Sequence, residues 1–128
     1  MTETLRPEEW LALAQNDLDA AHLLQSGGSG FHAKVCFLAQ QCVERSLKGV
    51  LVSFSEEPPY IHDLKRLMEL VGEAGGTVPA DIAEAEFLTP YAAQLRYATR
   101  EERSPIEPER GLHLAEATLQ WAREAVRY

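Results

Sequence analysis

Residues 31–54 read FHAKVCFLAQQCVERSLKGVLVSF. The apolar residues of this segment have the spacing of an α-helix, with Ser29 as the expected N-cap. They cover too much of the helix surface for a helix with one solvated face. These apolar positions are Phe31, Val35, Leu38, Ala39, Cys42, Val43, Leu47, Val50, Leu51 and Phe54. We therefore predict a central helix that contacts at least two others; the alternative is that part of it forms a dimer interface.

Four further helices are predicted around this one. The five expected helices begin near Pro7, Phe31, His62, Ala80 and Pro108. Pro90 either kinks the fourth helix or restarts it with Thr89 as the cap. No segment shows the strict alternation of a strand. The sequence thus predicts an all-α fold, an up-and-down bundle of four or five helices in a single domain over residues 1–128.

The charge of the chain limits the partners that it suits. The formal net charge is −8, whereas nucleic-acid binders usually present a basic surface to the phosphates. Broad, non-specific binding of RNA is therefore disfavoured, and no DNA partner is expected. A basic partner would associate quickly with so acidic a chain.

The sequence also indicates a cellular compartment. No apolar run approaches the ~20 residues that cross a bilayer, and the polar, acidic first residues do not read as a signal peptide. Cys36 and Cys42 lie on one predicted helix, about 9 Å apart along its axis, which is too far for a disulfide. We therefore expect a cytoplasmic protein with free thiols and no membrane association.

Motifs that bind cofactors or metals are absent from the sequence. It has no glycine-rich phosphate loop, no G-x-S-x-G elbow and no His-Glu-x-x-His zinc motif. No two histidines are four positions apart, the spacing that would place them on one helix face; they are His22, His32, His62 and His113. We expect neither a metal site nor a cofactor.

The helix of residues 31–54 carries one polar face. Gln40, Glu44 and Lys48 follow one another at intervals of four residues, so an amide, an acid and a base share that face. The simplest interpretation is a helical ion pair between Glu44 and Lys48, worth ~0.2–0.5 kcal/mol. The alternative is that these side chains face a ligand.

Two later segments carry further candidates. His62 and Asp63 stand at an expected helix start, where Asp63 suits the positive end of the helix and His62 can bond a backbone group. A functional His62 would need a carboxylate or a ligand within reach. Tyr91 and Arg96 lie on adjacent helical positions, an arrangement that can stack a base and bind a phosphate. The alternative for Arg96 is to complement the negative end of its helix.

Taken in order, these segments resemble the HEPN domain family. The first helix contains AQNDLDAA, and the later motifs are Ala39-Gln-Gln-x-x-Glu-Arg-x-x-Lys48, His62-Asp-Leu64 and Tyr91-x-x-x-x-Arg-Tyr97. The resemblance covers about residues 10–125. It implies a helical bundle that is usually dimeric and often encoded beside a minimal nucleotidyltransferase, commonly in toxin–antitoxin pairs with the HEPN member as ribonuclease toxin. The ligand-binding residues that it implies are Gln41, Glu44, Lys48, His62, Asp63, Tyr91, Arg96 and Tyr97.

The chain departs from this family at the ribonuclease signature. Ribonuclease members use an arginine and a later histidine with four to six residues between them, whereas Arg110 precedes His113 by only three positions and Arg103 precedes it by ten. Ala98 also follows Tyr97 where the family usually has proline. We therefore expect a non-catalytic or weakly active module that dimerises and binds a nucleotide, a nucleotidyltransferase partner or both.

Two alternatives remain. One is a divergent, metal-independent ribonuclease in which Arg96 stabilises phosphate charge, His62 acts as the base and Tyr91 stacks a base of single-stranded RNA. The other is a purely structural helical subunit, suggested by the broad apolar surface of residues 31–54. Arg96 and His62 are the candidate catalytic residues of the first alternative.

Overall fold

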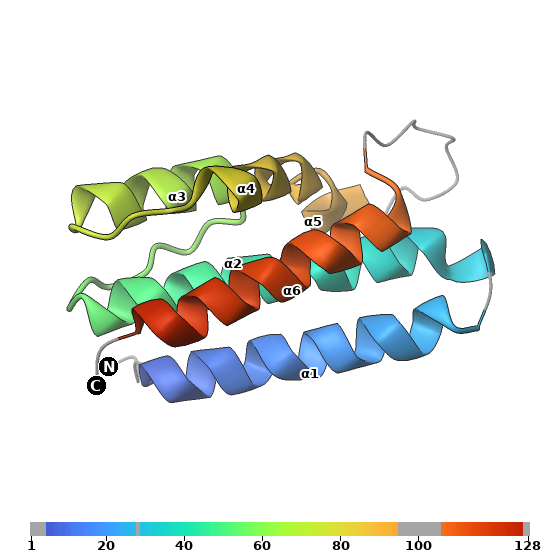
Figure 1. The fold of residues 1–128 in the computed structure, drawn as a ribbon, viewed down its shortest axis with the longest axis horizontal. Helices are drawn as coiled ribbons and strands as arrows, with labels where there is room; N and C mark the ends of the chain where they lie inside the picture. The colour runs from blue at the N-terminus through green and yellow to red at the C-terminus, as the bar shows by residue number, and fades with distance from the viewer. Residues whose placement is uncertain (1–4, 28, 95–105, 127–128) are drawn as a thin grey trace.

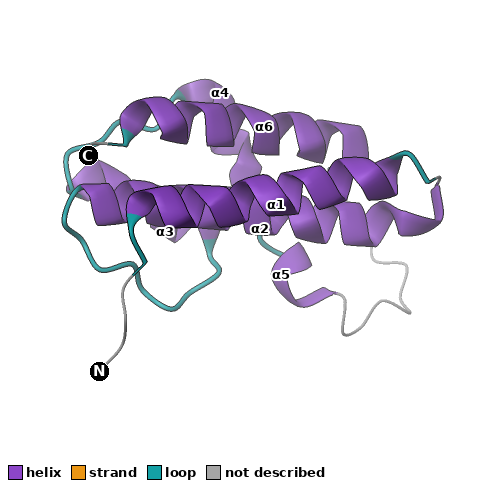
Figure 2. Ribbon diagram, turned by 90° about the horizontal axis from the view of Figure 1, so that it is seen from below, coloured by secondary structure: helices purple, strands orange, loops and turns teal. Residues whose placement is uncertain are grey.

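The computed structural model describes residues 5–27, 29–94 and 106–126. Their regular elements are all helical, and none of these residues is in a strand (Figures 1 and 2). The α-helices are α1 (Pro7–Gln25), α2 (His32–Ser53), α3 (Leu64–Glu73), α4 (Ala80–Ala83), α5 (Tyr91–Gln94) and α6 (Pro108–Ala125). Two 3₁₀ segments, Ser29–Phe31 and Glu84–Leu88, complete the order. The predicted all-α bundle is confirmed.

Helix α2 lies at the centre of the bundle, as predicted. It packs against α1, α3, α5 and α6 (Figure 1). Helices α1 and α2 run in opposite directions, but α2 and α3 run in the same direction because the segment between them returns along the bundle (Figure 1). Both α2 and α3 therefore end at the same end of the molecule.

The core consists of the helical stripes that the sequence indicates. The buried side chains of α6 are spaced by three and four residues, as expected of one face of a helix. At Gly49 the backbones of α1 and α2 approach closely, because a Cβ atom there would lie 3.0 Å from the Cβ of Trp10 and 3.1 Å from a methyl of Leu11. The apolar face of α2 is covered within one chain, so it does not require a second copy; its buried apolar residues are Val35, Cys36, Ala39, Cys42, Val43, Leu47, Val50 and Leu51.

Two predicted helix starts differ from the structure by only one and two residues, but the predicted cap of α2 is wrong. Helix α2 begins at His32 with Phe31 in the N-cap position, so the prediction of Ser29 as N-cap is wrong: a 3₁₀ turn comes first. Helix α3 begins at Leu64 rather than near His62, because Asp63 is its N-cap and accepts a hydrogen bond from the Arg66 backbone N–H at 3.2 Å.

The segment around Pro90 restarts as a new helix. The α-helix after residue 80 is only one turn long and continues as the 3₁₀ segment Glu84–Leu88, and α5 starts at Tyr91. The hydroxyl of Thr89, the predicted cap, accepts a hydrogen bond from the backbone N–H of Leu64 at 3.0 Å. Thr89 thus satisfies a free N–H in the first turn of α3.

Helices α2 and α3 end in the same backbone motif. Ser55 (φ 64°) and Gly75 (φ 110°) follow the two C-caps in the left-handed region. In each case the next N–H reaches back to a carbonyl of the last turn, from Glu56 to Leu51 and from Gly76 to Val71, at 2.9 Å. The two terminations are thus closed by the chain's own backbone.

The length of the helices and the state of the cysteines can be compared with the predictions. Among the described residues, no helix has the length and apolar character to span a bilayer. Cys36 and Cys42 are free and buried. Burial raises the pKa of the Cys42 thiol to about 12, so that thiol stays protonated at neutral pH.

Candidate functional site

A buried carboxylate on α2 organises the candidate site. Glu44 accepts hydrogen bonds from Gln40 Nε2 at 2.9 Å, from Lys48 Nζ at 2.8 Å and from His62 Nδ1 at 3.0 Å. Gln40 and Lys48 reach it because they lie one helical turn before and after it. His62 comes from the segment that leads into α3. These four residues are called the Glu44 cluster below.

The Glu44 carboxylate is ionised at neutral pH. Burial by itself raises the pKa of Glu44, but the hydrogen bonds from Lys48, His62 and Gln40 outweigh burial and leave that pKa below its ordinary value. Lys48 is only 5% exposed, and its ammonium lies 5.9 Å from the centre of the Trp10 ring as well as against Glu44. The lysine charge is therefore neutralised and covered, and it is poorly placed to hold a phosphate.

His62 is the solvent-facing member of the cluster. Its side chain is 63% exposed, while the Glu44 side chain is nearly buried. Because a carboxylate only accepts hydrogen bonds, Nδ1 of His62 must carry the proton in this contact. Nε2 makes no hydrogen bond to the described part of the chain, so it is the ring atom left for an external molecule. The capping role of Asp63 fixes the backbone next to it.

Gln41 belongs to a second polar group. Asp17 of α1 is buried and accepts hydrogen bonds from Arg45 Nη1 at 3.0 and 3.2 Å and from Gln41 Nε2 at 3.4 Å. Burial is the main influence on Asp17 and the arginine offsets it only in part, so the pKa of Asp17 lies above its ordinary value. This group joins α1 to α2, and the negative charge of Glu44 also contributes to the raised pKa of Asp17.

Tyr91 lies in the core. It is 4% exposed, and its hydroxyl donates to the backbone carbonyl of Ile106 at 3.5 Å. Burial raises the pKa of the Tyr91 hydroxyl. Its ring therefore has no open face on which a base can stack in this structure. Arg96 and Tyr97, the other candidates from this segment, lie outside the described residues.

The structure thus divides the eight implied residues. It brings Glu44, Lys48 and His62 together. Gln41 instead binds Asp17, Asp63 is the N-cap of α3, and Tyr91 is buried. Two members of the polar surroundings were not among the predicted ligand-binding residues. Gln40 was recognisable from its spacing to Glu44, whereas nothing in the sequence indicated that Trp10 covers Lys48.

His62 can accept or donate hydrogen bonds to a bound molecule. Glu44 and Lys48 form an ion pair in which the two charges neutralise each other. Among residues 5–27, 29–94 and 106–126, no three His, Cys, Asp or Glu side chains are arranged to hold a metal ion. The chemistry that these residues offer is recognition or proton exchange at a single imidazole backed by a carboxylate.

Comparisons with known proteins agree with the fold. The family model of the HEPN domain matches residues 7–125. The crystal structure of ST0689, described as an archaeal HEPN homologue, is 27% identical and aligns with a TM-score of 0.74 over 97% of this chain and 100% of its own. The crystal structure of TT1696 from Thermus thermophilus is 29% identical, with a TM-score of 0.80 over 94% and 98%. No curated protein matches the chain.

Proposed function

Because the chain belongs to the HEPN domain family, we propose that it is a non-catalytic or weakly active HEPN module that binds a nucleotide at the Glu44 cluster and forms a homodimer. Its protein partner in this proposal is a minimal nucleotidyltransferase, in a toxin–antitoxin pair of the kind that the family commonly forms. The observation that carries the nucleotide site is the contact between buried Glu44 and exposed His62.

The cluster favours binding over catalysis. Metal-independent RNA cleavage needs a group that moves the 2′-hydroxyl proton and a cation that stabilises charge on the phosphate. The cation within the Glu44 cluster is Lys48, which is covered and bonded to Glu44. The arginine–histidine spacing of ribonuclease members is also absent from the sequence. His62 can still form hydrogen bonds to a base or a phosphate without any chemical step.

The net charge favours a small ligand. Each phosphate brought to a chain of net charge −8 meets unfavourable long-range repulsion. A mononucleotide carries few phosphates and exposes base edges that an imidazole can bond. A long RNA or a DNA duplex would need a basic surface.

Calorimetric titration tests the nucleotide site. The purified protein is titrated with AMP, ATP, GTP, CMP and UMP, and the same titrations are made with His62→Ala and with His32→Ala. His32 is an exposed histidine at the start of α2 and is a matched control. We expect binding of at least one nucleotide, retained by His32→Ala and weakened about tenfold or more by His62→Ala. No heat with any nucleotide, or equal binding by both variants, would refute this site.

The homodimer and the partner are tested separately. Light scattering at micromolar concentration should give the mass of two chains, and the mass of one chain would contradict the dimer. Co-expression with the nucleotidyltransferase encoded beside the chain should yield a complex that survives gel filtration. Separate elution of the two proteins, or the absence of such a neighbouring gene, would count against the partnership.

One observation favours a second candidate, a divergent ribonuclease. The bond from His62 to Glu44 orients the imidazole as carboxylates orient catalytic histidines. Cleavage of single-stranded RNA in the presence of EDTA, compared for wild type, His62→Ala and Arg96→Ala, tests it. Loss of cleavage in both variants would support this candidate, and unchanged cleavage in His62→Ala would remove His62 as the base.

The third interpretation, a purely structural subunit, loses its main support. It rested on the broad apolar surface of residues 31–54, and the structure buries most of that surface against the other helices of the same chain, with Phe31 left 38% exposed.

A further inference from the structure

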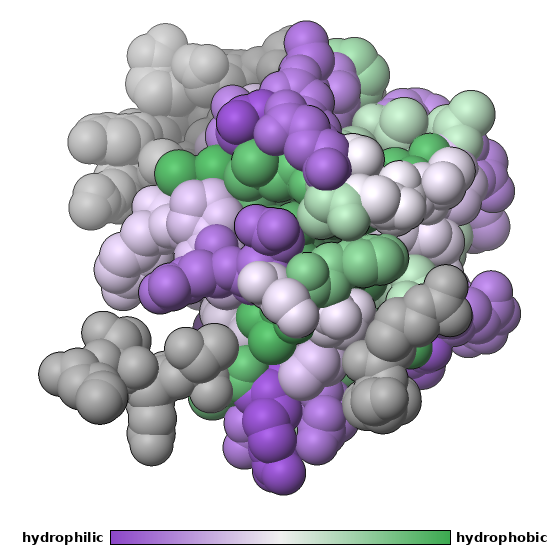
Figure 3. Space-filling view, turned by 90° about the vertical axis from the view of Figure 1, so that its left-hand side faces the viewer, coloured by the Kyte–Doolittle hydropathy of each residue, from purple (hydrophilic) through white to green (hydrophobic). Residues whose placement is uncertain are grey.

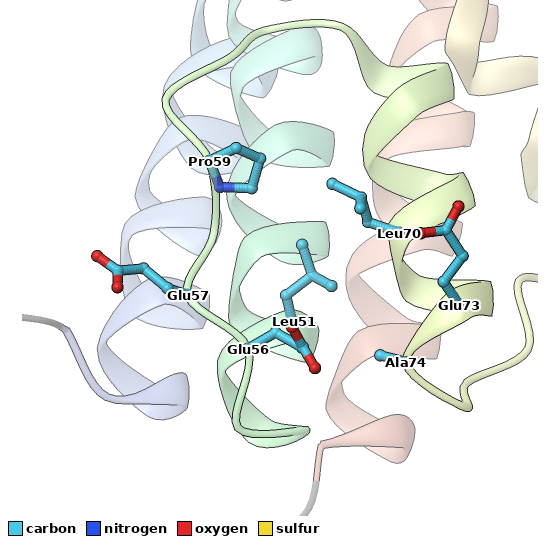
Figure 4. A pocket seen from close by; sticks show the side chains of 7 residues that line it. All are labelled: Leu51, Glu56, Glu57, Pro59, Leu70, Glu73 and Ala74. Atoms are coloured by element: carbon cyan, nitrogen blue, oxygen red, sulfur yellow. The ribbon is translucent and has the colours of Figure 1, made fainter.

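A pocket separate from the Glu44 cluster opens where α2 and α3 end. It has a volume of about 270 Å³ and lies between the last turns of these helices and the segment that connects them (Figure 4). Its lining residues are Leu51, Glu56, Glu57, Pro59, Leu70, Glu73 and Ala74. None of them belongs to the Glu44 cluster, and none is among the hydrogen-bond partners of Asp17, which are Gln41 and Arg45.

The pocket combines apolar walls with carboxylates. Leu51 and Leu70 extend toward the space between the helices (Figure 4). Glu73 is paired with Arg66 at 3.1 Å, whereas neither Glu56 nor Glu57 is in an ion pair with the residues that the structure describes. Figure 3 looks at the end of the bundle where α2 and α3 terminate, and it shows hydrophilic and hydrophobic side chains side by side.

The backbone adds to the negative charge of this place. Helices α2 and α3 both end here, and a helix C-terminus carries partial negative charge. Neither helix has a basic residue in its last turn to compensate. The Glu56 carboxylate, unpaired among the described residues, and two helix ends of the same sign favour a cation in the pocket. The Glu57 carboxylate points away from the space between the helices, so it adds negative charge beside the pocket and not inside it (Figure 4).

The kind of cation follows from the lining. The carboxylates do not converge as metal ligands do, since no such group is found among the described residues. A phosphate is excluded by its charge. A side chain with an aliphatic stem and a cationic head suits apolar walls edged by carboxylates, because the stem packs while the head remains at the acids. The next residue after Pro59 is Tyr60, which is 99% exposed and offers an aromatic face at the same segment.

The geometry points to a docking pocket for an arginine or lysine side chain from a basic segment of a partner protein. The net charge of −8 gives such a segment long-range attraction to the chain. This inference stands independently of nucleotide binding at His62.

Nuclear magnetic resonance tests the pocket with a defined probe. The ¹⁵N-labelled protein is titrated with the capped tripeptide acetyl-Leu-Arg-Leu-amide and with the same peptide carrying citrulline, the neutral isostere of arginine. We expect the arginine peptide to shift the amide resonances of Leu51, Glu57, Tyr60, Leu70 and Ala74, with a dissociation constant of about 1 mM. The citrulline peptide should shift them much less at equal concentration.

Two matched double variants test whether binding of the arginine peptide requires the carboxylates at the pocket. Glu56→Gln/Glu57→Gln should weaken the arginine peptide about three- to tenfold. Glu107→Gln/Glu109→Gln makes the same change in net charge at exposed positions by the start of α6 and should leave the affinity unchanged. Equal weakening by both pairs would show a general charge effect and overturn the pocket.

Two further outcomes would overturn the proposal. The first is the absence of shifts at the pocket, or equal shifts with citrulline. The second is a titration with spermidine that moves the same resonances at least as strongly as the peptide, because the pocket would then bind small free cations rather than a protein side chain.

Discussion

His62 Nδ1 lies 3.0 Å from Glu44 Oε1, although one side chain is exposed and the other is buried. The two residues are 18 positions apart, Glu44 on α2 and His62 in the segment that leads into α3. The contact couples a solvent-facing imidazole to a carboxylate that also neutralises Lys48. A change at Glu44 therefore affects both the stability of the bundle and the orientation of His62.

Replacing Glu44 with glutamine should destabilise the fold. The amide leaves the buried ammonium of Lys48 without a counter-charge, and breaking a buried ion pair in this way typically costs about 3 kcal/mol. Urea unfolding followed by circular dichroism measures the loss. Glu69→Gln, which removes one partner of an exposed pair with Arg66, should leave the midpoint unchanged. Equal midpoints for Glu44→Gln and wild type would contradict the structural role.

The stability of the fold should fall in acid, partly through Glu44. Its folded pKa lies below the unfolded value of 4.5, so its contribution is fully present above that pH and is lost as the pH falls through the folded pKa. Asp17 acts in the opposite sense, because its folded pKa is raised and its ionisation therefore costs stability as the pH rises. Urea midpoints measured between about pH 7 and pH 3 should fall less steeply in Glu44→Gln than in wild type. A parallel decline would contradict this assignment.

The two left-handed residues at the helix ends should respond oppositely to substitution. Ser55→Gly relieves a left-handed serine and should raise the free energy of unfolding by up to about 1 kcal/mol. Gly75→Ala should lower it by about 1 kcal/mol, although nothing lies within 4 Å of the added Cβ. Thermal unfolding checks both. If both variants changed the free energy of unfolding in the same direction, side-chain contacts and not backbone conformation would determine the effect of substitution at Ser55 and Gly75.

Gly49 should tolerate a larger residue poorly. A valine there must displace Trp10 or Leu11 at the closest approach of α1 and α2, which we expect to cost about 1–3 kcal/mol. Gly72→Ala is the control, because that site in α3 has nothing within 4 Å and alanine is the better helix former. Denaturant unfolding should show the first variant weakened and the second slightly stabilised. A neutral Gly49→Val would mean that α1 can move away from α2 without loss.

Local patterns in the sequence were enough to predict the first and last helices and the ion pair between Glu44 and Lys48. The predicted starts at Pro7 and Pro108 agree with the structure, because helix periodicity and a proline in the first turn act over a few residues. The spacing of Gln40, Glu44 and Lys48 likewise predicted neighbours on one helix face. The family resemblance instead indicated Gln41, whose side chain points about 100° away from that of Gln40 and reaches Asp17.

The partners of Tyr91 and His62 could not be predicted in the same way. Tyr91 looks like an aromatic beside an arginine in the sequence, but packing of α5 on α2 buries it. His62 needed a carboxylate within reach, and its acid comes from another element. Burial and contacts between distant segments depend on how whole helices pack.

By itself, the sequence of this protein determined approximately where the long helices begin and which side chains share a face of one helix, since both follow from bonds and contacts within a few residues. Only the tertiary structure decided that the connection after α2 turns back along the bundle. That turn brings His62 to Glu44 and places the ends of α2 and α3 around one acidic pocket. The physical reason is that burial of the apolar stripes fixes the direction of each helix, and local patterns do not contain that information.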